Sequence, residues 1–483
     1  MTAPGPTRTS DRELRRVALS GLLGTAVEFY DFLVYGTIAA LVFNDLFFPN
    51  TDPAVGTIAA LGTFAAGYLA RPLGGIVFGH FGDRLGRKSM LLLTMLLMGG
   101  ASFLIGLLPT YSAIGMWAPV LLVLLRVVQG IAIGGEWGGA TLMAAEHAGD
   151  RPRGRWTSFT QLGAPLGSLV SVGVVTALSA LPDDQFRSWG WRLPFLLSVV
   201  LLGVGLYVRL SVAESPLFTA AAAKRATEAK EPKGASGAKK ATGVAGATDR
   251  APLLDILRKP RAVLLGAGVG IAPFAAQSLL TTFLIAYATD HGYTRGQALL
   301  GVTLASATAL IALPVANLLS DRFGRRPVIA VGALLSGATA FPLLALVDSG
   351  RPGLLILACV IGHGIAQSTM YGPLAPLLTE MFGTRVRYTG ASLGYQSATL
   401  IGAGFSPLIA SSLVASYDSS APVAFLLIAA AVLTLAALWR IKETSGDRLT
   451  EGPADTDTAT ATATPTDPDS ATPGPRAQGA SPA

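Results

Sequence analysis

The sequence predicts an all-α membrane protein with twelve transmembrane helices, arranged in two pseudo-symmetric halves of six with both termini cytoplasmic. The composition is the first reason. Of the 483 residues, 51% are hydrophobic and 13% are charged, whereas soluble domains carry about 25% charged residues. The second reason is that the apolar residues come in runs long enough to cross about 30 Å of hydrocarbon as helices. The third is that charged motifs recur in the two halves of the chain.

Twelve apolar stretches follow one another along the chain, and each is long enough to span a bilayer as a helix. Their predicted ranges are Val17–Phe43, Ala54–His80, Ser89–Leu108, Trp117–Ala145, Trp156–Ala180, Leu193–Leu210, Ala262–Thr289, Gly296–Leu319, Val328–Val347, Leu354–Leu378, Tyr388–Ala415 and Pro422–Leu438.

The distribution of basic residues predicts the orientation. We number each loop by the predicted span that it follows. The loops with odd numbers contain only four basic residues, which are Arg187, Arg192, Arg295 and Arg351. Cytoplasmic loops are the ones that collect Lys and Arg, so we expect both termini in the cytoplasm. The net charge of +7 then reflects cytoplasmic loops and does not indicate nucleic-acid binding. The single cysteine, Cys359, excludes a disulfide within the chain and a cysteine metal site.

Two polar segments divide the chain. Residues 220–250 are rich in Ala, Lys and Gly, and residues 444–483 are dominated by Thr, Ala, Pro and Asp. Neither segment can bury enough apolar surface to fold alone. The predicted organisation is a cytoplasmic tail (1–16), a first six-helix half (17–212), a partly disordered cytoplasmic linker (213–261), a second six-helix half (262–440) and a disordered cytoplasmic tail (441–483).

The two halves repeat a pair of charged signatures. Gly82-Asp83-Arg84-Leu85-Gly86-Arg87-Lys88 follows the second span, and Ser320-Asp321-Arg322-Phe323-Gly324-Arg325-Arg326 follows the eighth. Glu146, Gly149, Arg151 and Arg153 follow the fourth span, and Glu380, Gly383, Arg385 and Arg387 follow the tenth with identical spacing. This pattern predicts duplication, with the halves related by an axis along the membrane normal.

The repeated Asp-Arg-x-Gly-Arg loop resembles the signature of the major facilitator superfamily. Further motifs are similar to its metabolite:proton symporter family, and they include Glu28-Phe29-Tyr30-Asp31-Phe32, Arg71-Pro72-Leu73-Gly74-Gly75, Arg126-Val127-Val128-Gln129-Gly130 and Gly134-Gly135-Glu136-Trp137-Gly138-Gly139. The stretch from Phe78 to Arg84 looks most like the shikimate permease branch. The resemblance implies proton-driven uptake of a small, often carboxylated metabolite by a monomer in the cell inner membrane.

Ionisable residues inside the predicted spans are candidates for proton coupling. Each costs about 2.5–3.5 kcal/mol at membrane depth and therefore faces a protein interior or a cavity. Glu28 and Asp31 are three residues apart and share a helix face, which Tyr35 continues. Such a carboxyl pair suits proton loading and release, with Asp31 the first candidate and Glu28 the second. The alternative is a static ion pair with Arg71 or Arg126. The full set of proton-coupling candidates is Asp31, Glu28, Arg126 and Glu136.

Arg126 has two open roles. Its planar guanidinium matches a carboxylate and stays charged when buried, which suits a substrate anion. It can equally pair with Asp31 or Glu136 and modulate the proton, and in the superfamily this position is linked to proton coupling. We expect Arg71 to be structural and paired with Glu136. The candidate substrate-binding residues are Arg126, Tyr35, Gln129, Gln277, His363, Gln367, Tyr371 and Gln396, with a structural role the alternative for His363.

The repeated charged signatures are candidates for a cytoplasmic gate. We expect Asp83 and Asp321 in tight turns between helices, where opposite charges bridge neighbouring helices. A network that forms in one conformation only can bias a two-state equilibrium. The alternative is that these charges only set the topology. The candidate gate residues are Asp83, Arg84, Arg87, Glu146, Arg153, Asp321, Arg322, Arg325, Glu380 and Arg387.

Other chemistry finds little support in the sequence. It contains no Walker loop, no nucleophile elbow and no paired His motif, so we expect neither an enzyme nor a cofactor or metal. Gly130, Gly134 and Gly138 recur every four residues, a pattern typical of close helix packing. A sugar porter and a drug/proton antiporter are alternatives within the same superfamily, and a non-transporting receptor is a third alternative.

Overall fold

The computed structural model describes residues 11–49, 53–85, 87–148, 153–210, 260–382 and 387–445. Within these ranges every regular element is helical. The first half consists of α1 (Asp11–Ile38), η1 (Ala39–Phe43), α2 (Asn44–Phe47), α3 (Pro53–Leu85), α4 (Arg87–Leu107), α5 (Tyr111–Ile114), α6 (Trp117–Ala148), α7 (Arg153–Leu178), α8 (Asp183–Ser188), η2 (Gly190–Arg192) and α9 (Leu193–Leu210).

The second half follows after a gap in the described residues. It consists of α12 (Pro260–Ser278), η3 (Leu279–Phe283), α13 (Leu284–Asp290), α14 (Arg295–Phe323), α15 (Arg325–Asp348), α16 (Pro352–Cys359), η4 (Val360–Gln367), α17 (Ser368–Glu380), α18 (Arg387–Thr399), η5 (Leu400–Gly404), α19 (Ser406–Tyr417) and α20 (Ala421–Arg440). The segments η1, η3, η4 and η5 are π-helical turns that continue α-helices, a feature often found at functional sites.

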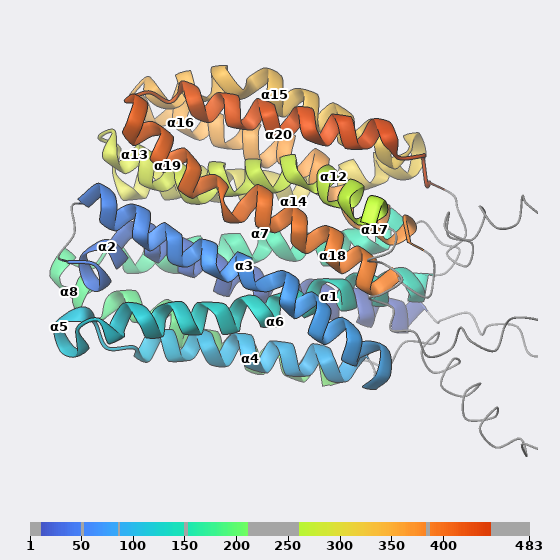
Figure 1. Ribbon diagram of the computed structural model, residues 1–483, viewed down its shortest axis with the longest axis horizontal. Coiled ribbons are helices and arrows are strands. Elements are labelled where there is room, and N and C mark those ends of the chain that lie inside the picture. Colours follow the sequence, from blue (N-terminus) through green and yellow to red (C-terminus); the bar gives the residue numbers. More distant parts are fainter. Residues whose placement is uncertain are drawn as a thin grey trace, which may run out of the picture.

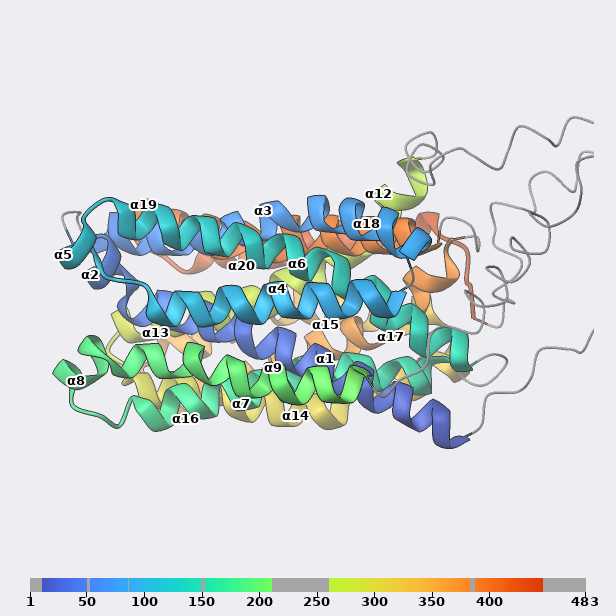
Figure 2. The ribbon, with the colours of Figure 1, turned by 90° about the horizontal axis from the view of Figure 1, so that it is seen from below.

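The long helices run side by side along the longest axis of the molecule, with the two halves lying next to each other (Figure 1). Within the first half α1 packs against α7 and α3 against α6, and within the second half α12 packs against α18 and α20. The halves meet along two seams. One joins α7 to α14 and α17, and the other joins α3 to α18; they lie on opposite sides of the molecule in Figure 2.

The two ends of the bundle differ in composition. The start of α1, the end of α9, the start of α12 and the end of α20 all lie at one end (Figures 1 and 2). We call it the arginine-rich end, and it holds Arg153, Arg325, Arg326 and Arg387. The short helices α2, α5 and α8 lie at the opposite end (Figure 1).

The all-helical prediction is confirmed. Among the described residues, 11 helical stretches are long and apolar enough to cross a membrane. α3 is not one of them, although it covers the second predicted span and runs along the bundle (Figure 2). The count of twelve spans and the cytoplasmic location of the termini stay predictions. Most of the predicted linker (213–261) and of the C-terminal tail (441–483) lies outside the described residues, as do residues 1–10.

Several helices extend beyond the predicted apolar runs into charged residues. α14 continues to Phe323, four residues past the predicted boundary at Leu319. The expectation that Asp83 and Asp321 lie in turns is therefore wrong, because both belong to the last turns of α3 and α14. The turn between α14 and α15 is Gly324, whose φ of 101° is a conformation that residues with a Cβ rarely adopt. Polar residues at the end of a span keep the helical hydrogen bonds, so hydrophobicity alone marks helix ends too early.

The glycine pattern on α6 serves packing, as predicted. A Cβ on Gly130 would lie 2.0 Å from the Gly67 carbonyl oxygen, and one on Gly134 would lie 2.0 Å from the Arg71 carbonyl oxygen. The backbones of α3 and α6 therefore touch. A Cβ on Gly138 would lie 2.0 Å from Oγ of Ser392 in α18, so this third glycine lets the two halves approach each other.

Candidate functional site

A small cavity lies between the halves. Its volume is about 20 Å³, which is room for about one water molecule. The first half contributes α1 and α3, and the second contributes α12, η3 and α18. The polar lining residues are Glu28, Tyr68, Arg71, Gln277, Ser278, Thr281, Thr282, Tyr395 and Thr399.

A second cavity of about 10 Å³ shares the lining residues Leu33, Gln277 and Thr281 with the first. Among its lining residues are His363, Gln367 and Tyr371, three of the predicted substrate-binding residues. The π-helical segments η3 and η4 carry Thr281, His363 and Gln367. The second cavity is thus lined by four predicted substrate-binding residues of the second half, Gln277, His363, Gln367 and Tyr371. The charged lining residues of the first cavity, Glu28 and Arg71, come from the first half.

Glu28 and Arg71 line the first cavity as buried groups with unused hydrogen-bonding capacity. Both residues are at most 5% exposed. The Oε2 atom of Glu28 and the Nε atom of Arg71 have no hydrogen-bond partner. Leaving a buried polar atom unpaired costs about 1–3 kcal/mol. Neither residue forms an ion pair within the described part of the chain, so the static pair considered from the sequence is not found.

Arg71 and Arg126 both stack on one aromatic ring. Their Cζ atoms lie 4.3 Å and 4.1 Å from the centroid of Phe32. Tyr68 gives Arg71 a second ring at 4.2 Å, and Tyr35 gives Arg126 one at 4.1 Å. Attraction between each cation and the ring faces offsets part of the cost of burying two like charges. The expectation that Arg71 pairs with Glu136 is wrong, because aromatic rings take that place.

Arg126 is fully buried within the first half. Its Nη1 donates a hydrogen bond to Gln129 Oε1 at 3.0 Å, and Gln129 Nε2 donates to Ser102 Oγ at 2.6 Å. Its Nε and Nη2 atoms have no partner. A Cβ on Gly67 would lie 2.7 Å from Arg126 Nε, so this glycine makes room for the guanidinium. Neither Arg126 nor Gln129 lines the cavities in this conformation.

The three polar residues on the shared face of α1 point to three different neighbours. Glu28 faces the first cavity. Asp31 accepts a hydrogen bond from the Ser198 hydroxyl of α9, and its Oδ2 atom has no partner. Tyr35 donates to Thr63 Oγ1 of α3 at 2.6 Å. Asp31 is therefore held within the first half, whereas Glu28 lies at the contact between halves.

Glu136 forms an ion pair with Arg209, a residue that the sequence analysis did not single out. Arg209 is in the last turn of α9 and 4% exposed. Its Nη1 also donates to the Leu91 carbonyl oxygen of α4 at 2.9 Å. The sequence signal for a functional role of Arg209 was its place in the last turn of an apolar stretch. An arginine at the membrane surface occupies the same kind of position, so this signal did not distinguish the two roles.

Other predicted residues tie the halves together. Gln396 donates to the Gly134 carbonyl oxygen at 3.2 Å, and Thr399 donates to Gln396 Oε1 at 3.2 Å. Tyr371 accepts a hydrogen bond at its carbonyl from Gln161 Nε2 at 3.0 Å. The Gln396–Gly134 and Gln161–Tyr371 hydrogen bonds cross between halves, so a rearrangement of the halves must break them.

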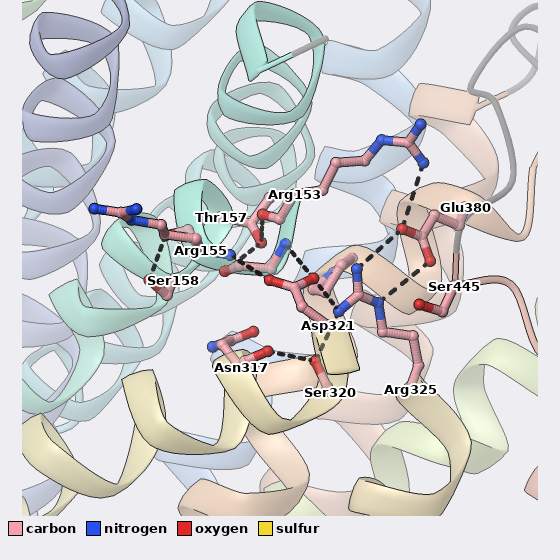
Figure 3. Close-up of polar contacts among 12 residues, drawn as sticks. Arg153, Arg155, Thr157, Ser158, Asn317, Ser320, Asp321, Arg325, Glu380 and Ser445 are labelled. Carbon is pink, nitrogen blue, oxygen red and sulfur yellow. Dashed lines mark hydrogen bonds and ion pairs between the residues drawn. The ribbon is translucent and has the colours of Figure 1, made fainter. Parts of the chain in front are cut away.

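A polar network closes the arginine-rich end (Figure 3). Arg153 of the first half lies 3.5 Å from Glu380 Oε1 of the second. Arg325 contacts both Glu380, at 3.4 Å, and Asp321, at 2.6 Å. Asp321 also accepts hydrogen bonds from the backbone N–H groups of Gly154 and Arg155, each at 3.1 Å. The second half thus supplies the N-terminal cap and a favourable negative charge for α7 of the first half.

The cap depends on a residue without a side chain. A Cβ on Gly154 would lie 2.6 Å from Asp321 Oδ1 and 2.8 Å from Asp321 Cγ. Behind it, Glu380 accepts a hydrogen bond from the Thr444 hydroxyl at 2.8 Å. The Asp321 carboxylate can therefore approach the start of α7 because Gly154 has no side chain.

The remaining gate candidates do not all join this network. Arg322 is exposed, and its guanidinium lies 5.3 Å from the Phe323 ring centroid. Arg387 is buried and donates to the Phe382 carbonyl oxygen at 3.0 Å. The side chains outside the described part are those of Asp83, Arg84, Arg87 and Glu146.

Contacts between the halves are also present at the opposite end. Arg295 lies 3.1 Å from Asp183, and between the two ends Ser168 and Ser306 are hydrogen-bonded at 2.8 Å. Sites for small molecules usually measure about 300–1,000 Å³. The two central cavities are far smaller, so a solute of ordinary size enters only after the halves separate.

Comparisons with known proteins agree with this geometry. A model of the "Sugar (and other) transporter" family matches residues 17–455. The shikimate transporter of Escherichia coli is 40% identical over 416 residues, which cover 86% of this chain and 91% of the relative. The proline/betaine transporter of E. coli is 34% identical, with 90% of this chain and 85% of the relative covered. In solved structures, the xylose transporter XylE of E. coli in a partially occluded inward-open state aligns with a TM-score of 0.68 and 20% identity, over 90% of this chain and 100% of that one.

Proposed function

The chain belongs to the sugar (and other) transporter family of multi-pass membrane proteins, and from this premise we propose that it imports a small polar metabolite by proton symport. The observation that carries the proposal is the first cavity, where Glu28 and Arg71 each keep a polar atom without a partner. An unpaired carboxyl suits a transported proton, and an unpaired guanidinium suits a transported anion. Similarity to the shikimate transporter supports a small organic acid such as shikimate as the substrate.

Two carboxyl groups carry the proton in this proposal. Asp31 keeps one oxygen free next to the Ser198 hydroxyl, and Glu28 faces the space that the solute occupies. Occupation of the site by an anion next to Arg71 changes the electrostatic balance around both groups. Proton release and solute release are then linked. Release of the proton leaves a negative carboxylate near the bound anion, and release of the anion leaves the positive charge of Arg71 near the carboxyl groups.

A zwitterion is the second candidate substrate. The first cavity offers charges of both signs, Glu28 and Arg71, between aromatic rings. A carboxylate suits a guanidinium, and a quaternary ammonium suits aromatic faces and a carboxylate. Similarity to the proline/betaine transporter supports the same candidate.

The rearrangement between states is a rocking motion of the two halves in the proposed cycle. We place the arginine-rich end in the cytoplasm of the cell, with the protein a monomer in the inner membrane. The Asp321 cap and the Arg153–Glu380 pair hold this end shut while the site faces outward. Exposed ion pairs contribute only about 0–1 kcal/mol each, but the Arg153–Glu380 pair is largely buried, and it breaks together with the cap when the halves separate.

Uptake into proteoliposomes tests the proposal. Purified protein is reconstituted, an acid-outside pH gradient is imposed, and labelled shikimate, dicarboxylates, citrate, aromatic acids, betaine and proline are supplied in turn. We expect one solute class to accumulate at least tenfold over protein-free vesicles, and a protonophore to abolish the accumulation. Equal uptake with and without the gradient would refute symport, and uptake of none of the classes would refute the substrate assignment.

A voltage measurement separates the two substrate candidates. Moving one charge across 100 mV is worth about 2.3 kcal/mol. Import of one proton with a monoanion moves no net charge, whereas import of one proton with a zwitterion moves one. An imposed potential should therefore drive betaine uptake and leave shikimate uptake unchanged.

A further inference from the structure

Arg209 lies beside the backbone of α1, one helical turn from Glu28. A Cβ on Gly24 would lie 2.1 Å from Arg209 Nη2 and 2.9 Å from Cζ. The guanidinium therefore occupies the space that any other residue at position 24 would fill. Gly24 precedes Glu28 by four residues, and helical side chains lean toward the N-terminal turn. The carboxyl group of Glu28 thus has Arg209 within reach of a change of rotamer.

Two buried carboxyl groups interact with this one guanidinium, Glu136 through an ion pair and Glu28 electrostatically. Arg209 donates from Nη2 to Glu136 Oε1, while the second oxygen of Glu136 has no partner. Glu28 also has an oxygen without a partner, and it interacts electrostatically with both Glu136 and Arg209. The other charged or titratable groups that act on Glu28 are Arg71, Tyr68, Tyr371 and Tyr395.

We propose that Arg209 is a positioning residue for proton coupling, shared between Glu136 and Glu28. While Glu28 carries its proton, Arg209 stays with Glu136. When the O–H bond of Glu28 breaks and the proton passes to water, the new carboxylate attracts Arg209, whose own charge does not change. The transfer loosens α9 from α6 and draws it toward α1. This inference rests on the proposed role of Glu28 as a proton carrier.

The arrangement gives the proton a mechanical consequence. Arg209 is the last but one residue of α9, at the arginine-rich end, and its Nη1 holds the Leu91 carbonyl of α4. Movement of its guanidinium from α6 to α1 changes the contact among three helices of the first half. A network with two alternative pairings can bias a two-state equilibrium when each state favours one pairing.

Three variants test the proposal. Arg209→Gln removes the charge, Arg209→Lys keeps the charge and loses the planar fork, and Gly24→Ala keeps every charge but displaces the guanidinium from α1. Gly203→Ala is the matched control, because a Cβ at this position of α9 meets no atom within 4 Å. A Cβ at Gly24 meets the end of a flexible side chain, so we expect the Gly24 variant to fold.

The measured quantity is the pH dependence of gradient-driven uptake, with the solute that the wild-type protein accumulates. For Arg209→Gln we expect the pH of half-maximal uptake to move up by about one unit or more, since the deprotonated state has lost a cation. Arg209→Lys should restore most of the profile, and Gly24→Ala should move it in the same direction by less. Wild-type profiles in both Arg209→Gln and Gly24→Ala would overturn the proposal.

A second measurement needs no substrate. Infrared titration of the reconstituted protein follows the carbonyl stretch of protonated carboxyl groups, and Glu28→Gln identifies the Glu28 band. We expect the titration midpoint of this band to shift in Arg209→Gln and Gly24→Ala and to stay at its wild-type value in Gly203→Ala. A band that titrates identically in all of them refutes the role of Arg209. A band that shifts in a protein that accumulates none of the solutes refutes symport of those solutes and leaves the role of Arg209 supported.

Discussion

The two halves share a repeated sequence signature, yet they place their buried charges differently. In the described part of the first half, charged residues are buried along the length of the bundle, and they are Glu28, Asp31, Arg71, Arg126, Glu136 and Arg209. In that of the second half, the buried charged residues are Arg325, Glu380 and Arg387, all near the arginine-rich end. The described Asp, Glu and Arg residues that are buried away from the arginine-rich end thus belong to the first half, whereas the second half contributes His363 to the second cavity.

The difference indicates a division of labour. In the proposed cycle the first half supplies the groups that exchange protons and bind anions. The second half supplies mainly hydroxyl and amide groups to the shared cavities, together with the imidazole of His363. A neutral partner costs less to bury when the halves separate and rejoin, because unpaired charges cost several kcal/mol more than unpaired amides.

The strongest test of this comparison is Asp31→Asn. We expect it to reduce accumulation against a gradient at least tenfold, to near equilibration, because an amide cannot carry the proton. Exchange of labelled for unlabelled solute should persist, since Asp31 does not line the cavities. Uptake and exchange in the same proteoliposomes check both expectations, with exposed Asp184→Asn as the control. Accumulation that survives in Asp31→Asn would place the proton elsewhere.

Arg71→Gln and Arg126→Gln separate the two stacked arginines. A hydrogen bond to a charged group contributes about 1.5–3 kcal/mol, so loss of the substrate contact should raise KM by about 10- to 100-fold. We expect the larger increase for Arg71, the only one of the two that lines a cavity. A larger effect on KM in Arg126→Gln would mean that the substrate sits deeper in the first half than the cavity.

Asp321→Ala probes the closure supplied by the second half. Loss of a helix N-cap costs about 0.5–2 kcal/mol, and we expect the equilibrium between open and closed arginine-rich ends to shift by about 2- to 30-fold toward the open state. Labelling of a cysteine introduced at Thr157, in the first turns of α7, should become faster. Thr303→Ala, a change on the same helix α14 away from this end, should leave the labelling rate unchanged.

Gln277→Leu should give the smallest effect. Gln277 lines both cavities, and a neutral hydrogen bond contributes about 0.5–1.5 kcal/mol. We expect KM to rise by about 2- to 10-fold with the pH profile unchanged. A change in the pH profile of this variant would show that the second half takes part in proton coupling and would break the comparison.

The sequence predicted the helical architecture and much of the candidate site, because charge inside an apolar run is a strong signal. Glu28, Asp31, Arg71, Arg126 and Glu136 stand out for this reason. Their partners were harder to predict. Ser198, Thr281 and Thr399 are unremarkable residues for a membrane helix, and Arg209 lies where an arginine at the lipid surface is equally expected.

The spacing of residues along the sequence does not predict which side chains on different helices contact one another. Glu28, Asp31 and Tyr35 share a face of α1, but neighbouring helices differ at each level, so the three side chains have different surroundings. The Arg71–Glu136 pair was wrong for a related reason. Aromatic rings compete with carboxylates for buried guanidinium groups, and the positions of Phe32 and Tyr68 relative to Arg71 depend on how α1 and α3 pack.

The hydrogen bond between Ser168 and Ser306 has a consequence for how the halves pivot. Ser168 lies about 22 Å along α7 from Arg153 and about 15 Å from the other end of the helix, at 1.5 Å per residue. A rotation of 10° about this point moves the two helix ends by roughly 4 Å and 3 Å in opposite directions, as a lever turns on its fulcrum. Such a tilt would pull apart Arg153 and Glu380 while pressing Asp183 toward Arg295, or the reverse. If the halves pivot as rigid bodies about this point, the two ends of the bundle cannot open at the same time. This property prevents leakage of solute through a carrier.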